Sequence, residues 1–372
     1  MASSARPKKS RKAAKKSKKS AKSASKAAAP PPVGPVTLEE AKALARAKEP
    51  QLAAKAVRKD LAPPTSPKNV GEERKILEKK TKDELDRRIK EYKATMSIMK
   101  KRGARRPKGA AAPEEGEPAA KAAGFAPLQV FAEGDSWFDY PVPLFGGGII
   151  PRVETRLGVP ILNLAKAGDE VRYMLGVDER KKLTKQLKQG CPAGGPWDAL
   201  LFSGGGNDIV DNPMALWVKE WNAAVPAVQH LNSARFNTAL DLVKAGYEDL
   251  IALRNKHSPN TLLLFHGYDF AIPNGRGVCF LGPWLKPTFD LMNFPLGAPR
   301  QEVVNEMLRR FATLLTGLHS EPNKIIFLNT QGTLTPQPSS WDNELHPSKA
   351  GFNKFADLFR DKLKQLFPGR VA

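Results

Sequence analysis

Five short clusters in the sequence hold residue types that suit acyl transfer. They lie at 133–137 (EGDSW), 167–169 (AGD), 204–208 (GGGND), 266–269 (HGYD) and 341–347 (WDNELHP). Together they contain a hydroxyl nucleophile, an imidazole base, carboxylates or an amide to orient the imidazole, and N–H donors for an oxyanion. The sequence therefore predicts acyl-transfer chemistry at a site that these clusters share.

Three of these residues have a predicted part in that chemistry. Ser136 follows Gly-Asp on a tight turn after an apolar run, where its hydroxyl can project into a cleft. The side-chain NH2 of Asn207 can point at a developing oxyanion. Gly168 carries no side chain that would block its own backbone N–H, so it can add a second donor.

The clusters adjoin elements that must position them. Five nearly continuous apolar runs are LQVFAE ending at Glu133, PILNLA ending at Ala165, ALLFSG ending at Gly204, TLLLFHG ending at Gly267 and KIIFLN ending at Asn329. Such runs are typical of parallel strands that are covered on both faces. Amphipathic stretches over 232–256, 299–317 and 348–367 predict helices. We expect a doubly wound α/β domain with a mainly parallel five-stranded sheet and helices on both faces, and ligands beyond the carboxyl ends of its strands.

The order of these strings resembles that of a known superfamily. GDSW, NLAKAGDE, GGND and NELHP follow one another as do the four blocks of the SGNH, or GDSL-type, hydrolases, and the resemblance covers about residues 125–372. It implies that Ser136 is the nucleophile and, through its own N–H, the first oxyanion donor. Gly168 and Asn207 would be the other donors and His346 the general base. The resemblance implies no metal and no organic cofactor.

The third member of the triad departs from that pattern. The family usually has Asp three residues before the catalytic His, and here that position is Asn343, with Asp342 and Glu344 on either side. A carboxylate stabilises the imidazolium better than an amide does, which favours Asp342. Position favours Asn343, which can accept the imidazole N–H in a Ser–His dyad, and Glu344 is a further alternative for the third member.

Other residues of the clusters are candidates for the pocket. Asp135 is either a turn former or a hydrogen-bond anchor beneath the site, and Trp137 either walls an acyl pocket or belongs to the core. His266 either lines the pocket together with Tyr268 and Asp269 or is a core histidine whose hydrogen bonds are satisfied.

These residues lead to three hypotheses about function. The first is a serine esterase that hydrolyses small-molecule esters, and the second is a carbohydrate O-deacetylase with the same residues. The third is a polyanion-binding protein whose hydrolase-like domain is degenerate. An apolar tunnel would favour long acyl chains, whereas an open groove would favour glycans.

Charge divides the chain unevenly. Its 372 residues carry a net charge of +22, and residues 1–124 hold 34 Lys and Arg against 14 Asp and Glu. Residues 1–36 contain no acidic residue, so we expect a disordered basic tail that contacts polyanions or anionic surfaces without reading sequence. A helical segment and a Pro/Gly/Ala-rich linker are expected over 37–124, with an amphipathic helix at 81–101 that packs on the main domain or mediates oligomerisation.

The first residues of the sequence indicate where in the cell the protein is expected. Its basic first residues precede no apolar region typical of a signal peptide, and no run of eighteen apolar residues occurs. We expect a cytoplasmic protein without a transmembrane segment, with non-classical export as the alternative. The oligomeric state does not follow from the sequence.

Overall fold

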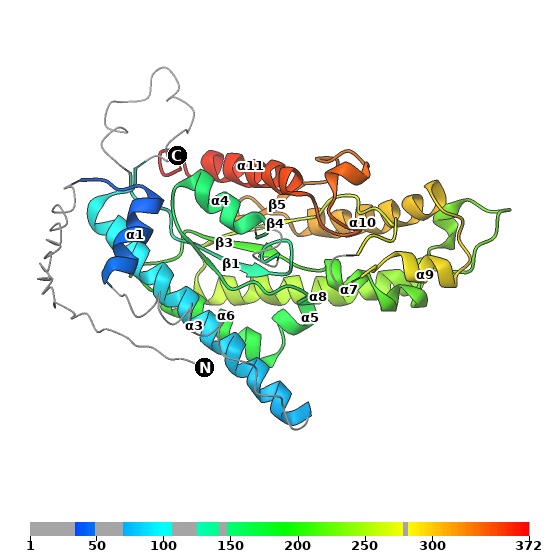
Figure 1. Cartoon of the computed structure of the whole chain (residues 1–372), viewed down its shortest axis with the longest axis horizontal. Coiled ribbons are helices and arrows are strands. Elements are labelled where there is room, and N and C mark those ends of the chain that lie inside the picture. The colour runs from blue at the N-terminus through cyan, green and yellow to red at the C-terminus, as the bar shows by residue number, and fades with distance from the viewer. Residues whose placement is uncertain (1–33, 49–69, 106–124, 141–146, 278–281, 372) are drawn as a thin grey trace, which may run out of the picture. The chain divides into compact units, whose positions relative to one another are not determined.

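The computed structural model describes residues 34–48, 70–105, 125–140, 147–277 and 282–371. Within them, five short apolar strands form one sheet: β1 (Val130–Gly134), β2 (Ile161–Asn163), β3 (Ala199–Ser203), β4 (Leu262–His266) and β5 (Ile325–Leu328). Their order is β2-β1-β3-β4-β5, and every neighbouring pair is parallel (Figure 1). All five strands lie in the predicted apolar runs, and the α/β fold expected from the sequence is confirmed.

Helices cover both faces of this sheet. In Figure 1, α4 (Ile149–Leu157) and α11 (Lys349–Leu366) lie above it, and α8 (Ser233–His257) lies below it. Side chains of neighbouring strand residues point alternately to the two layers: the ring of Phe265 lies 5.2 Å from that of Tyr247 on α8, whereas the ring of His266 lies 5.6 Å from that of Phe359 on α11. This alternation decides which side chains can meet on the α11 side.

Further helices complete the connections. They are α5 (Val171–Met174), α6 (Val177–Gln189), α7 (Gly206–Ile209), α9 (Lys286–Leu291) and α10 (Ala298–Leu318), with 3₁₀ helices η2 (Asn212–Leu216), η3 (Ala227–His230) and η4 (Pro338–Ser340). The predicted helices over 232–256, 299–317 and 348–367 are α8, α10 and α11. Both α8 and α11 begin at side-chain caps, Asn232 accepting from the Arg235 N–H and Ser348 from the Gly351 N–H.

The strand order determines where a ligand can bind. Strand β1 lies between β2 and β3, so the chain leaves it towards one neighbour and returns to the sheet on its other side. A crevice opens where the strand order reverses in this way, at the carboxyl ends of the strands. Residues of the clusters that follow β1 and β3, among them Ser136 and Asn207, line a cavity there.

Two N-terminal helices belong to the same compact unit as the sheet, which comprises residues 34–372. These are α1 (Leu38–Lys48) and α3 (Val70–Arg102), and the helix predicted over 81–101 is α3. Tyr92, Met96 and Met99 of α3 are buried. The division at residue 125 stays a prediction, and residues 1–33 and 106–124 of the predicted tail and linker lie outside the described residues. No helix in the described ranges has the length and apolarity needed to cross a bilayer.

Candidate active site

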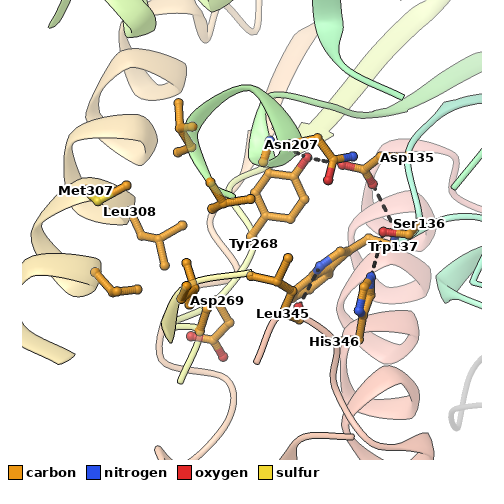
Figure 2. Close-up of a pocket in the computed structure, with 16 residues that line it drawn as sticks. Asp135, Ser136, Trp137, Asn207, Tyr268, Asp269, Met307, Leu308, Leu345 and His346 are labelled. Atoms are coloured by element: carbon orange, nitrogen blue, oxygen red, sulfur yellow. Dashed lines mark hydrogen bonds between the residues drawn. The ribbon is translucent and has the colours of Figure 1, made fainter. Parts of the chain in front are cut away.

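Ser136 lies on a turn that begins directly after β1. Gly134 ends this strand where β1 and β3 approach closely, and a Cβ on it would lie 2.5 Å from the Ser203 carbonyl oxygen. Asp135 holds the turn by accepting a hydrogen bond of 3.0 Å from the Trp137 N–H. The turn aims Ser136, which is 9% exposed, into a cavity (Figure 2).

His346 meets Ser136 from the segment before α11. Its Nε2 lies 2.7 Å from the Ser136 Oγ, and its ring stacks on Tyr140 at a centroid distance of 4.3 Å. Burial lowers the pKa of His346 to about 3, so the imidazole is neutral at neutral pH. A neutral imidazole whose Nε2 faces a hydroxyl can accept the proton of that hydroxyl.

Asn343 holds the other nitrogen of the imidazole. Its Oδ1 lies 3.0 Å from the His346 Nδ1 and also accepts from the backbone N–H groups of Leu345 and His346, each at 2.9 Å. Its Nδ2 donates to the Tyr140 hydroxyl oxygen at 2.8 Å. Since Oδ1 accepts only, Nδ1 carries the ring proton and Nε2 is left bare towards Ser136.

The two carboxylates beside Asn343 lie elsewhere. Burial raises the pKa of Asp342, and the cations Arg276 and Arg152 oppose that rise. Among the described contacts of His346, only Asn343 binds Nδ1, so the geometry gives the orienting position to Asn343 and not to Asp342, which the charge argument favoured. Glu344 is fully buried and accepts from four backbone N–H groups, those of Gly275, Trp284, Leu285 and Lys286.

The three predicted oxyanion donors follow β1, β2 and β3, Ser136 on a turn, Gly168 on a loop and Asn207 in the short helix α7. No described group accepts from the backbone N–H of Ser136 or of Gly168. Gly168 adopts a φ of +87°, which favours glycine over residues with a side chain. The Asn207 Nδ2 donates to the Asp169 carbonyl at 2.9 Å, which ties the loop after β3 to the loop after β2 and uses one of its two amide hydrogens.

A second set of buried residues lies directly beneath Ser136. The Oδ1 of Asp135 accepts from the Ser203 hydroxyl at 2.8 Å, and its Oδ2 accepts from the Tyr268 hydroxyl at 2.5 Å. The Ser203 Oγ in turn lies 3.0 Å from the Nε2 of His266, which is fully buried. Burial raises the pKa of Asp135 to about 6 and lowers that of His266 to about 3. Asp135 and His266 therefore form a hydrogen-bonded support under the turn.

The remaining predicted pocket residues divide between the cavity and the support. Trp137 and Tyr268 line the cavity and also contact each other edge to face at 5.2 Å. Asp269 lines the cavity too, but its carboxylate accepts from the N–H groups of Phe270, Gly332 and Leu334, which is a loop anchor's role.

The residues that line the cavity are mostly apolar. They include Ile209, Val210, Ala271, Leu285, Val304, Met307, Leu308 and Leu345. Three of these come from α10, and the helix predicted over 299–317 was not connected with the site in the sequence. An apolar wall beside a serine and a histidine suits the acyl part of an ester.

Comparisons with known proteins add likenesses of fold. No protein-family model and no curated protein matches the chain. The solved structure of the lipase Lip_vut3 from a goat rumen metagenome is similar at 18% identity and a TM-score of 0.42, covering 63% of this chain and 96% of that one.

An extracellular lipase from Streptomyces rimosus is similar at 15% identity and a TM-score of 0.42, with 63% of this chain and 99% of that one covered. A carbohydrate esterase of family 3 from Talaromyces cellulolyticus has 12% identity and a TM-score of 0.36, with 64% and 97% covered.

Proposed function

We propose that the protein is a serine hydrolase of carboxylic esters. The observation that carries the proposal is the line of hydrogen bonds from Ser136 through His346 to Asn343 at the edge of a cavity with an apolar wall. His346 stands within hydrogen-bond reach of both Ser136 and Asn343, and a base placed between a nucleophile and an orienting group is what nucleophilic acyl transfer needs.

The reaction would run in two halves. The Ser136 Oγ attacks the ester carbonyl while the His346 Nε2 takes the hydroxyl proton, and the negative charge moves to the carbonyl oxygen. Collapse of this tetrahedral species breaks the bond to the alcohol, and His346 returns the proton to the leaving alkoxide. A water molecule, deprotonated by His346, then attacks the acyl-enzyme and releases the acid and free Ser136.

The transition-state charge has three proposed donors. These are the N–H of Ser136, the N–H of Gly168 and the Nδ2 of Asn207, each at the carboxyl end of a different strand. Backbone and amide donors that are held in place before the reaction stabilise the oxyanion without reorganising during it. Asn343 would keep the imidazole proton on Nδ1 throughout.

The apolar wall favours an apolar acyl group over a polar one. An ester with an apolar acyl group is therefore the preferred substrate class, and a sugar O-acetate remains the second candidate because its acetyl group is also apolar. A panel of 4-nitrophenyl esters from acetate to palmitate, assayed beside acetylated sugars, separates these classes.

Labelling identifies the nucleophile. A fluorophosphonate probe should modify Ser136 in the full chain, and peptide mapping by mass spectrometry locates the label. Ser136→Ala should lose both labelling and ester turnover, by about four orders of magnitude or more in kcat, while it unfolds at the temperature of the wild type. Modification of another serine, or turnover near the wild-type rate in folded Ser136→Ala, would overturn the proposal.

A further inference from the structure

Arg88 on α3 reaches from the N-terminal part of the chain to the site loops. Its side chain is 25% exposed, and α3 lies against β2. A guanidinium has five N–H donors in a rigid planar fork, so its partners specify where it must lie. Arg88 has an acceptor for each of the five.

One edge of the guanidinium binds backbone. Nη1 donates to the carbonyl oxygens of Asn163 and Ala165, each at 3.2 Å. These residues end β2 and begin the loop that leads to Gly168. Two carbonyl groups bound to one nitrogen restrain the path of the loop just before the proposed oxyanion donor.

The other edge binds the turn of the nucleophile. Nη2 donates to both carboxylate oxygens of Asp139, at 3.2 and 3.0 Å, and Nε donates to Glu84 on α3 itself at 3.1 Å. The Asp139 N–H in turn donates to the Asp135 carbonyl at 3.0 Å, across the turn that carries Ser136. Arg88 thus joins the loop of Gly168 to the turn of Ser136.

A second contact between the same two loops has a different origin. The Asn163 Nδ2 donates to the Phe138 carbonyl at 3.2 Å, and its Oδ1 accepts from the Ala165 N–H at 3.1 Å. The Lys166 N–H also donates to the Gly134 carbonyl at 2.9 Å, so neutral hydrogen bonds already tie the loop after β2 to the end of β1. Arg88 adds a charged, multidentate donor, which is stronger and more directional than a neutral amide.

We propose that Arg88 is a positioning residue that sets the spacing between the N–H groups of Ser136 and Gly168, and that α3 is for this reason part of the catalytic unit. The inference rests on the proposed function, because those two N–H groups matter as oxyanion donors. It adds a residue that touches neither substrate nor reacting atoms and that lies outside the resemblance over residues 125–372.

The test compares Arg88→Gln with Arg87→Gln in the full-length chain. Arg87 is the matched control, since it precedes Arg88 on α3 and its ion pairs with described residues join only Glu84 and Glu91 of the same helix. Arg88→Gln should lower kcat about tenfold to a hundredfold and leave KM within about twofold, because a small misplacement of the donors affects the transition state more than the ground state. Arg87→Gln should leave both unchanged.

An ester and its thiono analogue together distinguish misplaced oxyanion donors from a loss of folded protein. The thiono analogue of an ester puts sulfur where the oxyanion forms, and sulfur accepts hydrogen bonds poorly, so an intact set of donors favours the oxo ester. The oxo-to-thiono rate ratio should fall in Arg88→Gln and recover in part in Arg88→Lys. An unchanged ratio, with a lower fraction of Ser136 labelled by fluorophosphonate, would overturn the inference and assign Arg88 to stability alone.

Asp139→Asn probes the same bridge from its other end. It should lower the oxo-to-thiono ratio in the same direction as Arg88→Gln even if Arg88→Gln does not fold, and an unchanged ratio would again contradict the inference. Failure of the proposed function itself appears separately, as absent labelling of Ser136 and absent ester turnover in the wild type.

Discussion

Two serine–histidine pairs lie close together in this protein. In one, the His346 Nε2 lies 2.7 Å from the Ser136 Oγ at the cavity, and in the other the His266 Nε2 lies 3.0 Å from the Ser203 Oγ in the core. Burial lowers the pKa of both histidines to about 3. Distance and titration therefore do not distinguish them.

The group that binds Nδ1 of each histidine distinguishes the two pairs. Asn343 Oδ1 accepts from the His346 Nδ1, which leaves Nε2 as a bare base. The Tyr268 N–H instead donates to the His266 Nδ1 at 3.2 Å, so the proton of His266 lies on Nε2 and is donated to Ser203. Opposite tautomers make one histidine an acceptor for a hydroxyl proton and the other a donor to a hydroxyl oxygen. A Ser–His contact indicates catalysis only when the far nitrogen is the donor.

The largest expected difference between the pairs is in turnover. His346→Ala should reduce kcat/KM by about four orders of magnitude, because the base is lost. His266→Ala should keep turnover within about tenfold and mainly lower the unfolding temperature, because it removes a buried hydrogen bond and leaves a void. Ester hydrolysis and thermal unfolding of both variants measure this contrast. A loss of turnover in His266→Ala as large as in His346→Ala, at equal stability, would make the inner pair catalytic.

The next difference concerns the group behind His346. Asn343→Ala should lower kcat about a hundredfold, since the imidazole loses the acceptor that fixes its tautomer. Asp342→Ala should stay within about threefold, because no described contact links its carboxylate to the imidazole. Steady-state kinetics of the two variants ranks the candidates. The reverse ranking would return the orienting role to Asp342, as the argument from charge had favoured.

The smallest expected effect is a shift in the pH dependence of kcat/KM when Asn343 is replaced by Asp. With its pKa lowered to about 3, His346 stays neutral as pH falls through 6.5, so kcat/KM should hold well below that pH and decline only as the imidazole protonates. Asn343→Asp should place a carboxylate at Nδ1, raise the pKa of His346 and move the acidic limb to higher pH, with kcat equal to or above the wild type. Profiles of kcat/KM between pH 4 and 9, with folding checked at each pH, test this. An acidic limb at the same pH in both proteins would contradict the assigned contact.

Much of the fold follows from local patterns. All five strands lie in the apolar runs, because strands covered on both faces need continuous apolar sequence. The helices α4 and α6 were not among the predicted elements. The clusters that contain Ser136, Gly168 and Asn207 follow predicted strands, the cluster that contains His346 precedes a predicted helix, and the structure brings Ser136 and His346 into contact.

The rest depended on contacts that no local pattern reveals. Charge favoured Asp342 over Asn343, but the backbone N–H groups of 345 and 346 converge on the side chain at 343, and only that side chain reaches Nδ1. The partners of Glu344 are backbone groups some sixty residues away in the sequence. The acceptors of Arg88 in the site loops lie 51 to 77 residues away in the sequence. The pattern that predicts a helix relates only residues three and four apart, so it cannot reveal these contacts.

Glu344 joins the segment that carries His346 to two other segments of the chain. Its carboxylate accepts from the N–H group of Gly275 and from those of Trp284 and Lys286, while Trp284 contacts the His346 ring edge to face at 5.8 Å. One buried side chain therefore couples the position of His346 to the positions of both segments. A change in the path of either segment would be transmitted through this carboxylate to the imidazole beside Ser136.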